Sequence, residues 1–186
     1  QDLFYMESFI PSALRRSYYK IENAEYYETL KTASTVSVLE GEPIEILIKN
    51  QMELLALGYL PNVALVNPSD YGTILTTPLG TSGAVTINGS VNFIGGVLNV
   101  NGLDILPANF VPANEYLVLD SSQIDKIVTD GISFGMFEQD GDNVTKNLIT
   151  CRLEQRSGLA IYREDAIISG LFVQPPPLAV NKTAKA

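Results

Sequence analysis

The sequence predicts an α+β fold, because segments with helical periodicity and segments with strand periodicity occur along one chain. Residues 12–33 contain good helix formers without an interior glycine or proline, and residues 43–58 repeat apolar side chains at the spacing of a buried helix face. Residues 148–156 instead alternate apolar and polar side chains, which is the period of two of a half-buried strand. A chain of 186 residues is long enough to bury one good core or two modest ones.

The N-terminal region is predicted to be a short strand followed by a helix. The apolar run of residues 3–10 indicates the strand, and Pro11 suits the first turn of the helix that continues to Ala33. The apolar side chains of this helix fall on two faces, so we expect it to contact partners on two sides. One face holds Leu14, Tyr18 and Ile21, and the other holds Tyr26, Tyr27, Leu30 and Ala33.

The next helix is the clearest one in the sequence, with Pro43 at its start and Gly58 at its end. Its predicted buried face consists of Ile44, Leu47, Ile48, Met52 and Leu55. A buried strand is expected at residues 63–66. Asn67 is then a natural N-cap for a short helix from Pro68, with Asp70 in its first turn near the positive end of the helix dipole.

Residues 76–114 are rich in Gly, Asn, Thr and Ser between apolar residues, which predicts short strands joined by tight turns. The pairs Asn88-Gly89 and Asn101-Gly102 are typical of type I′ hairpin turns, and Gly95-Gly96 indicates another turn. No glycine motif with the spacing of a phosphate-binding loop is present, so these glycines are interpreted as turn residues.

The C-terminal region is predicted to be a strand at residues 115–120, a short turn or helix containing Ile124, Ile127 and Val128, and two further strands. The first of these begins at residue 148 and is interrupted at Gly158, where we expect a bulge or a close backbone approach. The second covers residues 166–172 after a charged turn. The acidic residues of the loop 138–142 lack the spacing of a calcium-binding loop.

Composition excludes several classes of function. With 12 basic and 21 acidic residues the net charge is -9, which argues against a sequence-specific nucleic-acid-binding surface. The absence of histidine removes Ser-His and Cys-His nucleophiles and the commonest metal ligand, so we expect neither an enzyme nor a cofactor or metal. Cys151, the only cysteine, is interpreted as a small buried hydrophobic residue. No apolar run predicts a membrane span or a signal peptide.

Two segments resemble one known family. The segment VALVNPSDYGTI at residues 63–74 is similar to the strand, the Asn-Pro-x-Asp turn and the helix of HK97-type bacteriophage major capsid proteins. The second segment resembles the C-terminal end of the same proteins, and its matching residues are the pair Lys146-Asn147, Glu154, Arg156, Ala160, Tyr162, Arg163, Ala166, Ile167, Ile168 and Gly170. Both lie in the family's order, and the resemblance extends from about Glu42 to Phe172.

The resemblance implies an HK97-like capsid fold made of the axial domain and part of the peripheral domain. Residues 1–42 would contain the end of the spine helix of the peripheral domain, and residues 43–131 the axial domain. Residues 132–173 would supply the C-terminal strands of the peripheral domain, and residues 174–186 a flexible tail. Because full subunits of this type are longer, we expect the chain to be a proteolytic or cloned C-terminal fragment.

The implied function is that of a structural subunit of the virion capsid. It would assemble in the bacterial host cytoplasm with other copies of itself into hexamers and pentamers that enclose phage or prophage DNA. A scaffolding protein and a maturation protease are further partners that the resemblance leaves open. Two alternatives remain, namely the shell of an encapsulin-like nanocompartment and a standalone binding domain rich in hairpins.

Two residues are candidates for covalent crosslinking of the shell. In family members that crosslink, an asparagine matching Asn147 forms an isopeptide bond with a neighbour's lysine, and a glutamate matching Glu154 accepts a proton. That chemistry needs a neutral lysine and therefore a base in a partly desolvated place. The preferred interpretation is structural, with Asn147 at a strand edge and Glu154 paired with Arg152 or Arg156.

Overall fold

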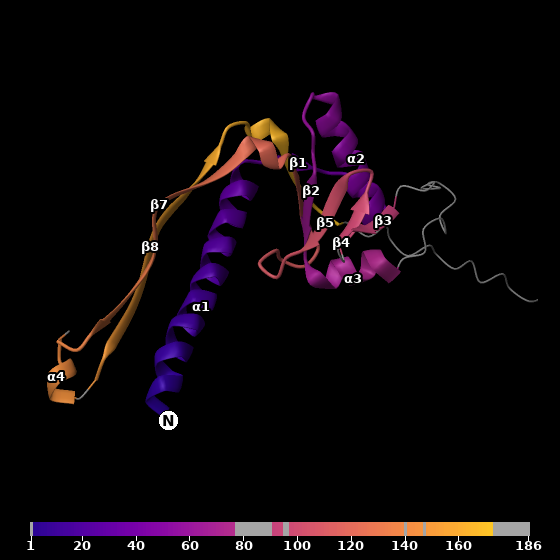
Figure 1. Cartoon of the computed structure of the whole chain (residues 1–186). Coiled ribbons are helices and arrows are strands. Elements are labelled where there is room, and N and C mark those ends of the chain that lie inside the picture. Colours follow the sequence, from indigo (N-terminus) through magenta and orange to yellow (C-terminus); the bar gives the residue numbers. More distant parts are fainter. Residues whose placement is uncertain (1, 77–90, 95–96, 140, 147, 173–186) are drawn as a thin grey trace, which may run out of the picture. The chain divides into compact units, whose positions relative to one another are not determined.

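The computed structural model describes residues 2–76, 91–94, 97–139, 141–146 and 148–172 (Figure 1). Its contacts divide the chain into two compact units, one of residues 1–33 and 121–164 and the other of residues 34–120 and 165–186. We call them the helix–hairpin unit and the sheet unit. Both helices and sheets are present, so the predicted α+β class is confirmed.

The sheet unit is built on seven strands in the spatial order β1-β9-β6-β2-β5-β4-β3. The pairs β1/β9 and β2/β5 are parallel, and the other neighbours are antiparallel. The strands are β1 (Thr35–Ser37), β2 (Val63–Val66), β3 (Val91–Ile94), β4 (Val97–Val100), β5 (Leu103–Pro107), β6 (Glu115–Leu119) and β9 (Ile167–Leu171).

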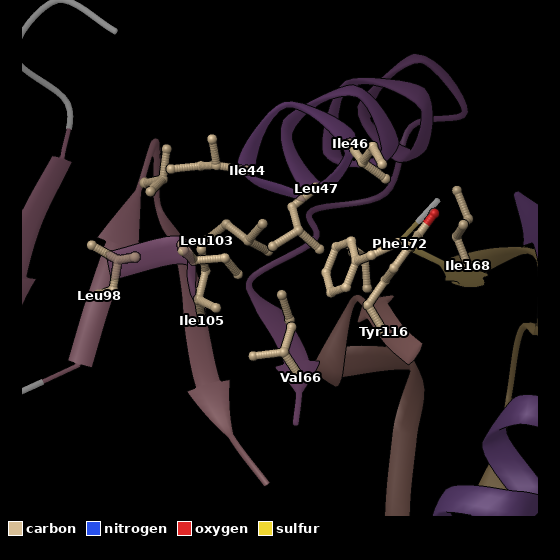
Figure 2. Packing of buried hydrophobic residues seen from close by; sticks show 14 of the residues in the cluster. Ile44, Ile46, Leu47, Val66, Leu98, Leu103, Ile105, Tyr116, Ile168 and Phe172 are labelled. Atoms are coloured by element: carbon tan, nitrogen blue, oxygen red, sulfur yellow. The ribbon is translucent and has the colours of Figure 1, made fainter. Parts of the chain in front are cut away.

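Helix α2 (Pro43–Ala56) covers one face of this sheet and forms the core with it (Figure 2). Leu47 is fully buried against the sheet residues Val66 and Ile105 of the same cluster. The predicted buried face is partly wrong, because Met52 and Leu55 are 45% and 39% exposed. The residues that α2 buries are Ile44, Ile46, Leu47, Asn50, Gln51 and Leu54.

The face of α2 differs from the prediction because two of its buried residues are polar and find partners in the sheet. Asn50 donates a hydrogen bond from Nδ2 to the Tyr116 hydroxyl at 2.9 Å, and Gln51 donates one from Nε2 to the Asn101 carbonyl at 3.1 Å. A pattern of apolar residues alone does not include such positions. Gly170 of β9 lies so close to the Tyr116 hydroxyl that any side chain there would collide with it.

The junction between β2 and α3 (Pro68–Thr76) agrees with the prediction. The Asn67 side chain accepts a hydrogen bond at Oδ1 from the Ser69 amide at 2.9 Å, which is an N-cap contact. Its Nδ2 also donates to the Val111 carbonyl at 2.6 Å. Asp70 lies in the first turn of α3 and accepts a hydrogen bond from the Asn114 amide at 2.7 Å, so it holds the loop before β6.

One of the predicted tight turns is described, and it is confirmed. Asn101 and Gly102 join β4 to β5 with φ angles of 52° and 85°, as a two-residue type I′ turn requires. Asn88-Gly89 and Gly95-Gly96 lie outside the described residues, as does the predicted tail of residues 174–186.

The helix–hairpin unit begins with α1 (Asp2–Ala33), which is longer than predicted. The strand expected at residues 3–10 is wrong, since these residues belong to the helix and Pro11 lies inside it. A short apolar run does not by itself distinguish a strand from a helix segment, and here helix continues through it. Tyr27 and Leu30 are buried as expected, whereas Ile21 is 68% exposed.

The second part of this unit is a long hairpin of β7 (Ile124–Phe137) and β8 (Thr150–Ile161), with helix α4 (Asn143–Lys146) near its tip. A short helical turn at residues 121–123 precedes β7, and another at residues 164–166 forms the predicted charged turn. The turn or helix predicted around Ile124, Ile127 and Val128 is wrong, because pairing with β8 makes these residues a strand.

The irregularity expected at Gly158 is found on the other strand. Gly158 pairs in register with Ile127, and the space around it is open, so neither a bulge nor a close backbone approach occurs there. The ladder instead shifts register in β7 between Val128 and Asp130 and again between Asp130 and Ser133. Cys151, predicted to be buried, is half-buried on β8, so that prediction is confirmed only in part.

We expect Leu47→Ala to lower the free energy of unfolding by roughly 2 to 5 kcal/mol, because it leaves a cavity in the core beneath α2. Chemical denaturation of the chain measures this change. Leu57→Ala is the matched control, since Leu57 is 61% exposed just after the same helix. Equal losses of stability in the two variants would contradict the assignment of the buried face.

Candidate functional site

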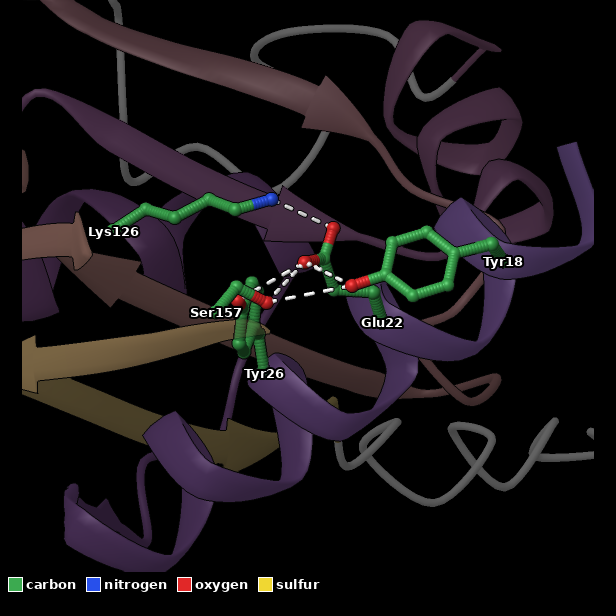
Figure 3. Close-up of polar contacts among 5 residues, drawn as sticks. All are labelled: Tyr18, Glu22, Tyr26, Lys126 and Ser157. Carbon is green, nitrogen blue, oxygen red and sulfur yellow. Dashed lines mark hydrogen bonds and ion pairs between the residues drawn. The ribbon is translucent and has the colours of Figure 1, made fainter. Parts of the chain in front are cut away.

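The helix–hairpin unit contains a dense polar cluster around one buried carboxylate (Figure 3). Glu22 of α1 is 7% exposed. Its Oε2 accepts a hydrogen bond from Lys126 Nζ at 2.7 Å, and its Oε1 accepts one from Ser157 Oγ at 2.6 Å. The hydroxyls of Tyr18 and Tyr26 donate to the same Oε1 at 3.0 and 3.1 Å. One carboxylate therefore connects α1 with both strands of the hairpin.

The hydrogen bonds of this cluster stabilise the charged forms of both Glu22 and Lys126. Burial by itself raises the pKa of Glu22, but the hydrogen bonds from Lys126, Ser157 and the two tyrosines outweigh it and lower that pKa from 4.5 to about 2. The pKa of Lys126 is raised by its hydrogen bond to Glu22, against the effect of burial. Glu22 is thus ionised and Lys126 protonated across the physiological pH range, so the cluster is a structural contact and not an acid or base.

Aromatic rings complete the environment of the Lys126 ammonium group. Its Nζ lies 5.4 Å from the centre of the Tyr26 ring and 6.0 Å from that of Tyr19. Cation–π attraction of this kind supports a charge that is partly removed from water. This cluster was not predicted from the sequence, although a signal exists. Tyr18, Glu22 and Tyr26 recur every four residues, which places them on one face of a helix.

The outer end of the hairpin carries a different kind of surface. Met136 and Phe137 at the end of β7 are 45% and 40% exposed, and Ile149 on the opposite chain segment is 57% exposed. Met136, Phe137, Ile149 and Arg152 contribute to the lining of a shallow hollow there. The Arg152 guanidinium lies 4.9 Å from the centre of the Phe137 ring. We call Met136, Phe137 and Ile149 the hairpin-end patch, a surface of the kind that proteins bury against a partner.

The buried side chain of Asn143 forms hydrogen bonds to both strands at the end of the hairpin. It is 9% exposed and donates from Nδ2 to the Phe137 carbonyl at 3.0 Å and to Thr150 Oγ1 at 2.8 Å. The last residue of β7 and the first of β8 are thereby connected through the start of α4. Phe137 of the hairpin-end patch therefore lies on backbone that this side chain holds in place.

The two crosslink candidates are not brought together by the described structure. Glu154 is exposed on β8, and its Oε1 forms an ion pair with Arg152 Nε at 3.0 Å, which is the structural interpretation expected for it. Both side chains of this pair are more than half exposed in the single chain, whereas amine attack would require a base in a partly desolvated place. Asn147 lies outside the described residues.

Within the described part of the chain, no group of three metal-ligating side chains is close enough to hold a metal ion. None of the described helices is long and apolar enough to cross a membrane.

A family model described as "Phage capsid protein" matches residues 6–167 of the chain. The chain belongs to the phage capsid protein family. The match covers most of α1, the whole hairpin of this phage capsid protein and the strands of the sheet unit up to the first residue of β9, so it includes parts of both units. No curated protein matches the sequence significantly.

Solved structures agree with this assignment at the level of fold. The phage capsid protein is similar to a chain from Mycobacterium phage Che8, with a TM-score of 0.61, 12% identity, and coverage of 84% of this chain and 60% of that one. It is also similar to a chain from Mycobacterium phage Ogopogo, with a TM-score of 0.57, 17% identity, and coverage of 77% of this chain and 55% of that one. A third similar structure is the virus-like particle from Pyrococcus furiosus, with a TM-score of 0.54, 14% identity, and coverage of 81% of this chain and 60% of that one.

These likenesses establish the HK97-like capsid fold that the sequence predicted. They also show that the phage capsid protein spans only 55% to 60% of the length of the chains it resembles.

We expect Glu22→Gln to destabilise the phage capsid protein by about 3 kcal/mol at neutral pH, because a pKa lowered from 4.5 to about 2 corresponds to about that free energy. Denaturant unfolding measures the change. Glu154→Gln is the matched control, since its ion pair is exposed and should contribute less than about 1 kcal/mol. A loss for Glu22→Gln no larger than for the control would show that the cluster is not a stabilising contact.

The contribution of Glu22 should also depend on pH in a defined direction. A carboxylate whose pKa is lowered on folding adds stability above its unfolded pKa and loses it as pH falls through the folded value. The difference in unfolding free energy between the wild type and Glu22→Gln should therefore be constant at neutral pH and shrink as pH falls from 4.5 toward about 2. A difference that stays constant through this range would contradict the assigned ionisation.

Proposed function

We propose that this chain is part of a structural subunit of an icosahedral phage capsid that assembles with other copies into hexamers and pentamers enclosing DNA. The observation that carries the proposal is the family match over residues 6–167. The absence of histidine and the exposure of Glu154, the candidate base, favour a structural and non-enzymatic role. Copies of the same subunit are its main partners, arranged around closed symmetry axes.

The surface of the helix–hairpin unit supports assembly through protein contacts. The hairpin-end patch leaves Met136, Phe137 and Ile149 in water, which is unfavourable unless a partner covers them. With a net charge of -9, the chain is also poorly suited to strong contacts with packaged DNA. Binding energy between subunits, and not affinity for nucleic acid, is the basis of the proposed shell.

We assign α1, which lies within residues 1–42, to the end of the spine helix of the peripheral domain. Residues 43–131 are assigned to the axial domain and residues 132–173 to the C-terminal strands of the peripheral domain. The long α1 and its ionic contact with the hairpin support the first assignment. Localisation in the virion capsid, after assembly in the host cytoplasm, follows from the same proposal.

Expression of the complete reading frame that contains this chain tests the proposal. Electron microscopy should show closed shells, and the contents of the shells distinguish a phage capsid from a nanocompartment, since the first encloses DNA and the second encloses cargo protein. Soluble subunits that form no shell with or without co-expressed phage proteins would overturn it.

A single substitution at the hairpin-end patch should weaken assembly without unfolding the subunit. Ile149→Asp places a charge on an apolar side chain that is 57% exposed, so it should reduce shell yield while the melting midpoint stays the same. Asn23→Asp on the exposed surface of α1 is the control with the same added charge. Shells that form equally well from both variants would exclude the hairpin-end patch from the interface.

For the crosslink candidates we expect a shell held by non-covalent contacts only. The complete subunit should migrate as a single species after the shell is heated in detergent. Covalent multimers that disappear on Asn147→Ala would reverse this expectation and make Asn147 a functional residue. Glu154→Gln would then show whether the exposed glutamate serves as the base.

A further inference from the structure

The sheet unit has a mostly apolar groove at one end of its sheet. Leu65, Pro68 and residues 106–110 line it. Leu65 and Leu106 are register partners on β2 and β5, and both are half-buried on the sheet face opposite to the one that α2 covers. None of these lining residues is charged. We call this feature the sheet-end groove.

The last described strand ends at the same edge of the sheet as the groove. Register pairs Leu171 of β9 with Glu115 of β6, and Tyr116 beside it with Val66 of β2. Val66 in turn pairs with Pro107 of β5. The ends of β9, β2 and β5 are therefore aligned. The Phe172 amide also donates to the Asn114 carbonyl at 2.8 Å, which fixes the exit of the chain at this edge.

The segment that follows Phe172 is apolar and proline-rich. Residues 173–180 read VQPPPLAV and carry no charge, whereas lysines occur only beyond them, at positions 182 and 185. Neighbouring strands lie about 4.8 Å apart, so the three steps from β9 to β5 cover roughly 14 Å. A polyproline-type segment rises about 3.1 Å per residue, so about five residues reach from Phe172 to the groove.

We propose that the sheet-end groove binds the proline-rich segment of its own chain, residues 173–180. Uncharged proline and leucine side chains fit a groove without charges, and extended proline-rich peptides lose little entropy on binding. Their backbone carbonyls have no internal partners, and Asn109, the polar residue of the lining, can donate its side-chain amide to one of them. Pro68 and Pro107 are exposed, so they offer ring surfaces to the peptide.

This contact would cover Leu65 and Leu106 without help from a second subunit. It is independent of the proposed capsid function, because the groove and the segment belong to one chain. The test therefore uses the chain as it is, in dilute solution, and its result is separate from the formation of shells.

Photo-crosslinking of the full chain tests the proposal. With p-benzoylphenylalanine placed at position 178, irradiation should give crosslinks that mass spectrometry maps to Leu65 or to residues 106–110. The same photoreactive residue at position 57, which is exposed just after α2, is the control and should not react with the groove. Crosslinks from position 178 scattered over the whole surface would overturn the proposal.

Two variants make the test specific. Leu106→Asp, which puts a charge into the groove, should lower the crosslink yield about five-fold or more, since loss of about 1 kcal/mol changes an equilibrium by that factor. Leu57→Asp should leave the yield unchanged. If Leu106→Asp fails to fold, replacement of the three prolines at 175–177 by glycine weakens the same contact from the other side. Unchanged yields in both Leu106→Asp and the variant without the three prolines would refute the contact.

Mixing isotopically light and heavy chains distinguishes the source of the segment. Crosslinks within light chains and within heavy chains are expected. Crosslinks found only between light and heavy chains would overturn the proposal, because the segment would then bind the groove of a neighbouring copy.

Discussion

The buried carboxylate of Glu22 is the contact on which the arrangement of the helix–hairpin unit depends. A long helix and a two-stranded hairpin have little shared core, and an isolated hairpin is at best marginally stable in water. Glu22 replaces that missing core with a network, because Lys126 comes from β7, Ser157 from β8, and Tyr18 and Tyr26 from α1 itself. Four donors compensate for removing the carboxylate from water, and an unpaired charge there would be strongly destabilising.

The sheet unit is stabilised differently, through an apolar core with a few polar contacts that fix its geometry. Leu47, Val66 and Ile105 supply the burial. The hydrogen bond from Asn50 to Tyr116 then requires one position of α2 on the sheet, and a residue without a side chain is needed at Gly170 to make room for the tyrosine. A buried hydrogen bond that can form in only one arrangement favours a single packing of the core.

The difference between the two units would matter for assembly in the proposed shell. The sheet unit folds around its own core, whereas the helix–hairpin unit presents apolar side chains on a backbone fixed by Glu22 and Asn143. A subunit that must join many identical neighbours needs surfaces that are exposed in the free chain and still well ordered. The hairpin-end patch combines these two properties. In the proposed shell, the acidic balance of the chain would leave protein contacts as the main source of assembly energy.

The sequence by itself determined the class of the fold, the strand at residues 63–66 with its capped helix α3, and the Asn101-Gly102 turn. These features follow from local chemistry, namely an N-cap side chain, a proline at a helix start and residues that accept positive φ. The resemblance to capsid proteins also came from residue order, and the family match confirmed it.

The other features were decided by tertiary structure, because they depend on contacts between residues that are far apart in the sequence. Ile124 to Val128 became a strand only through pairing with β8, and residues 3–10 became helix although their apolar run also suits a strand. Asn50 is buried because Tyr116, 66 residues away, accepts its hydrogen bond. In the sequence, Glu22 looks like any charged residue on a helix surface. Its role depends on hydrogen bonds from Lys126 and Ser157, which lie 104 and 135 residues further along the chain. Local periodicity records which face is apolar, but it carries no information about a polar partner that only folding places within reach.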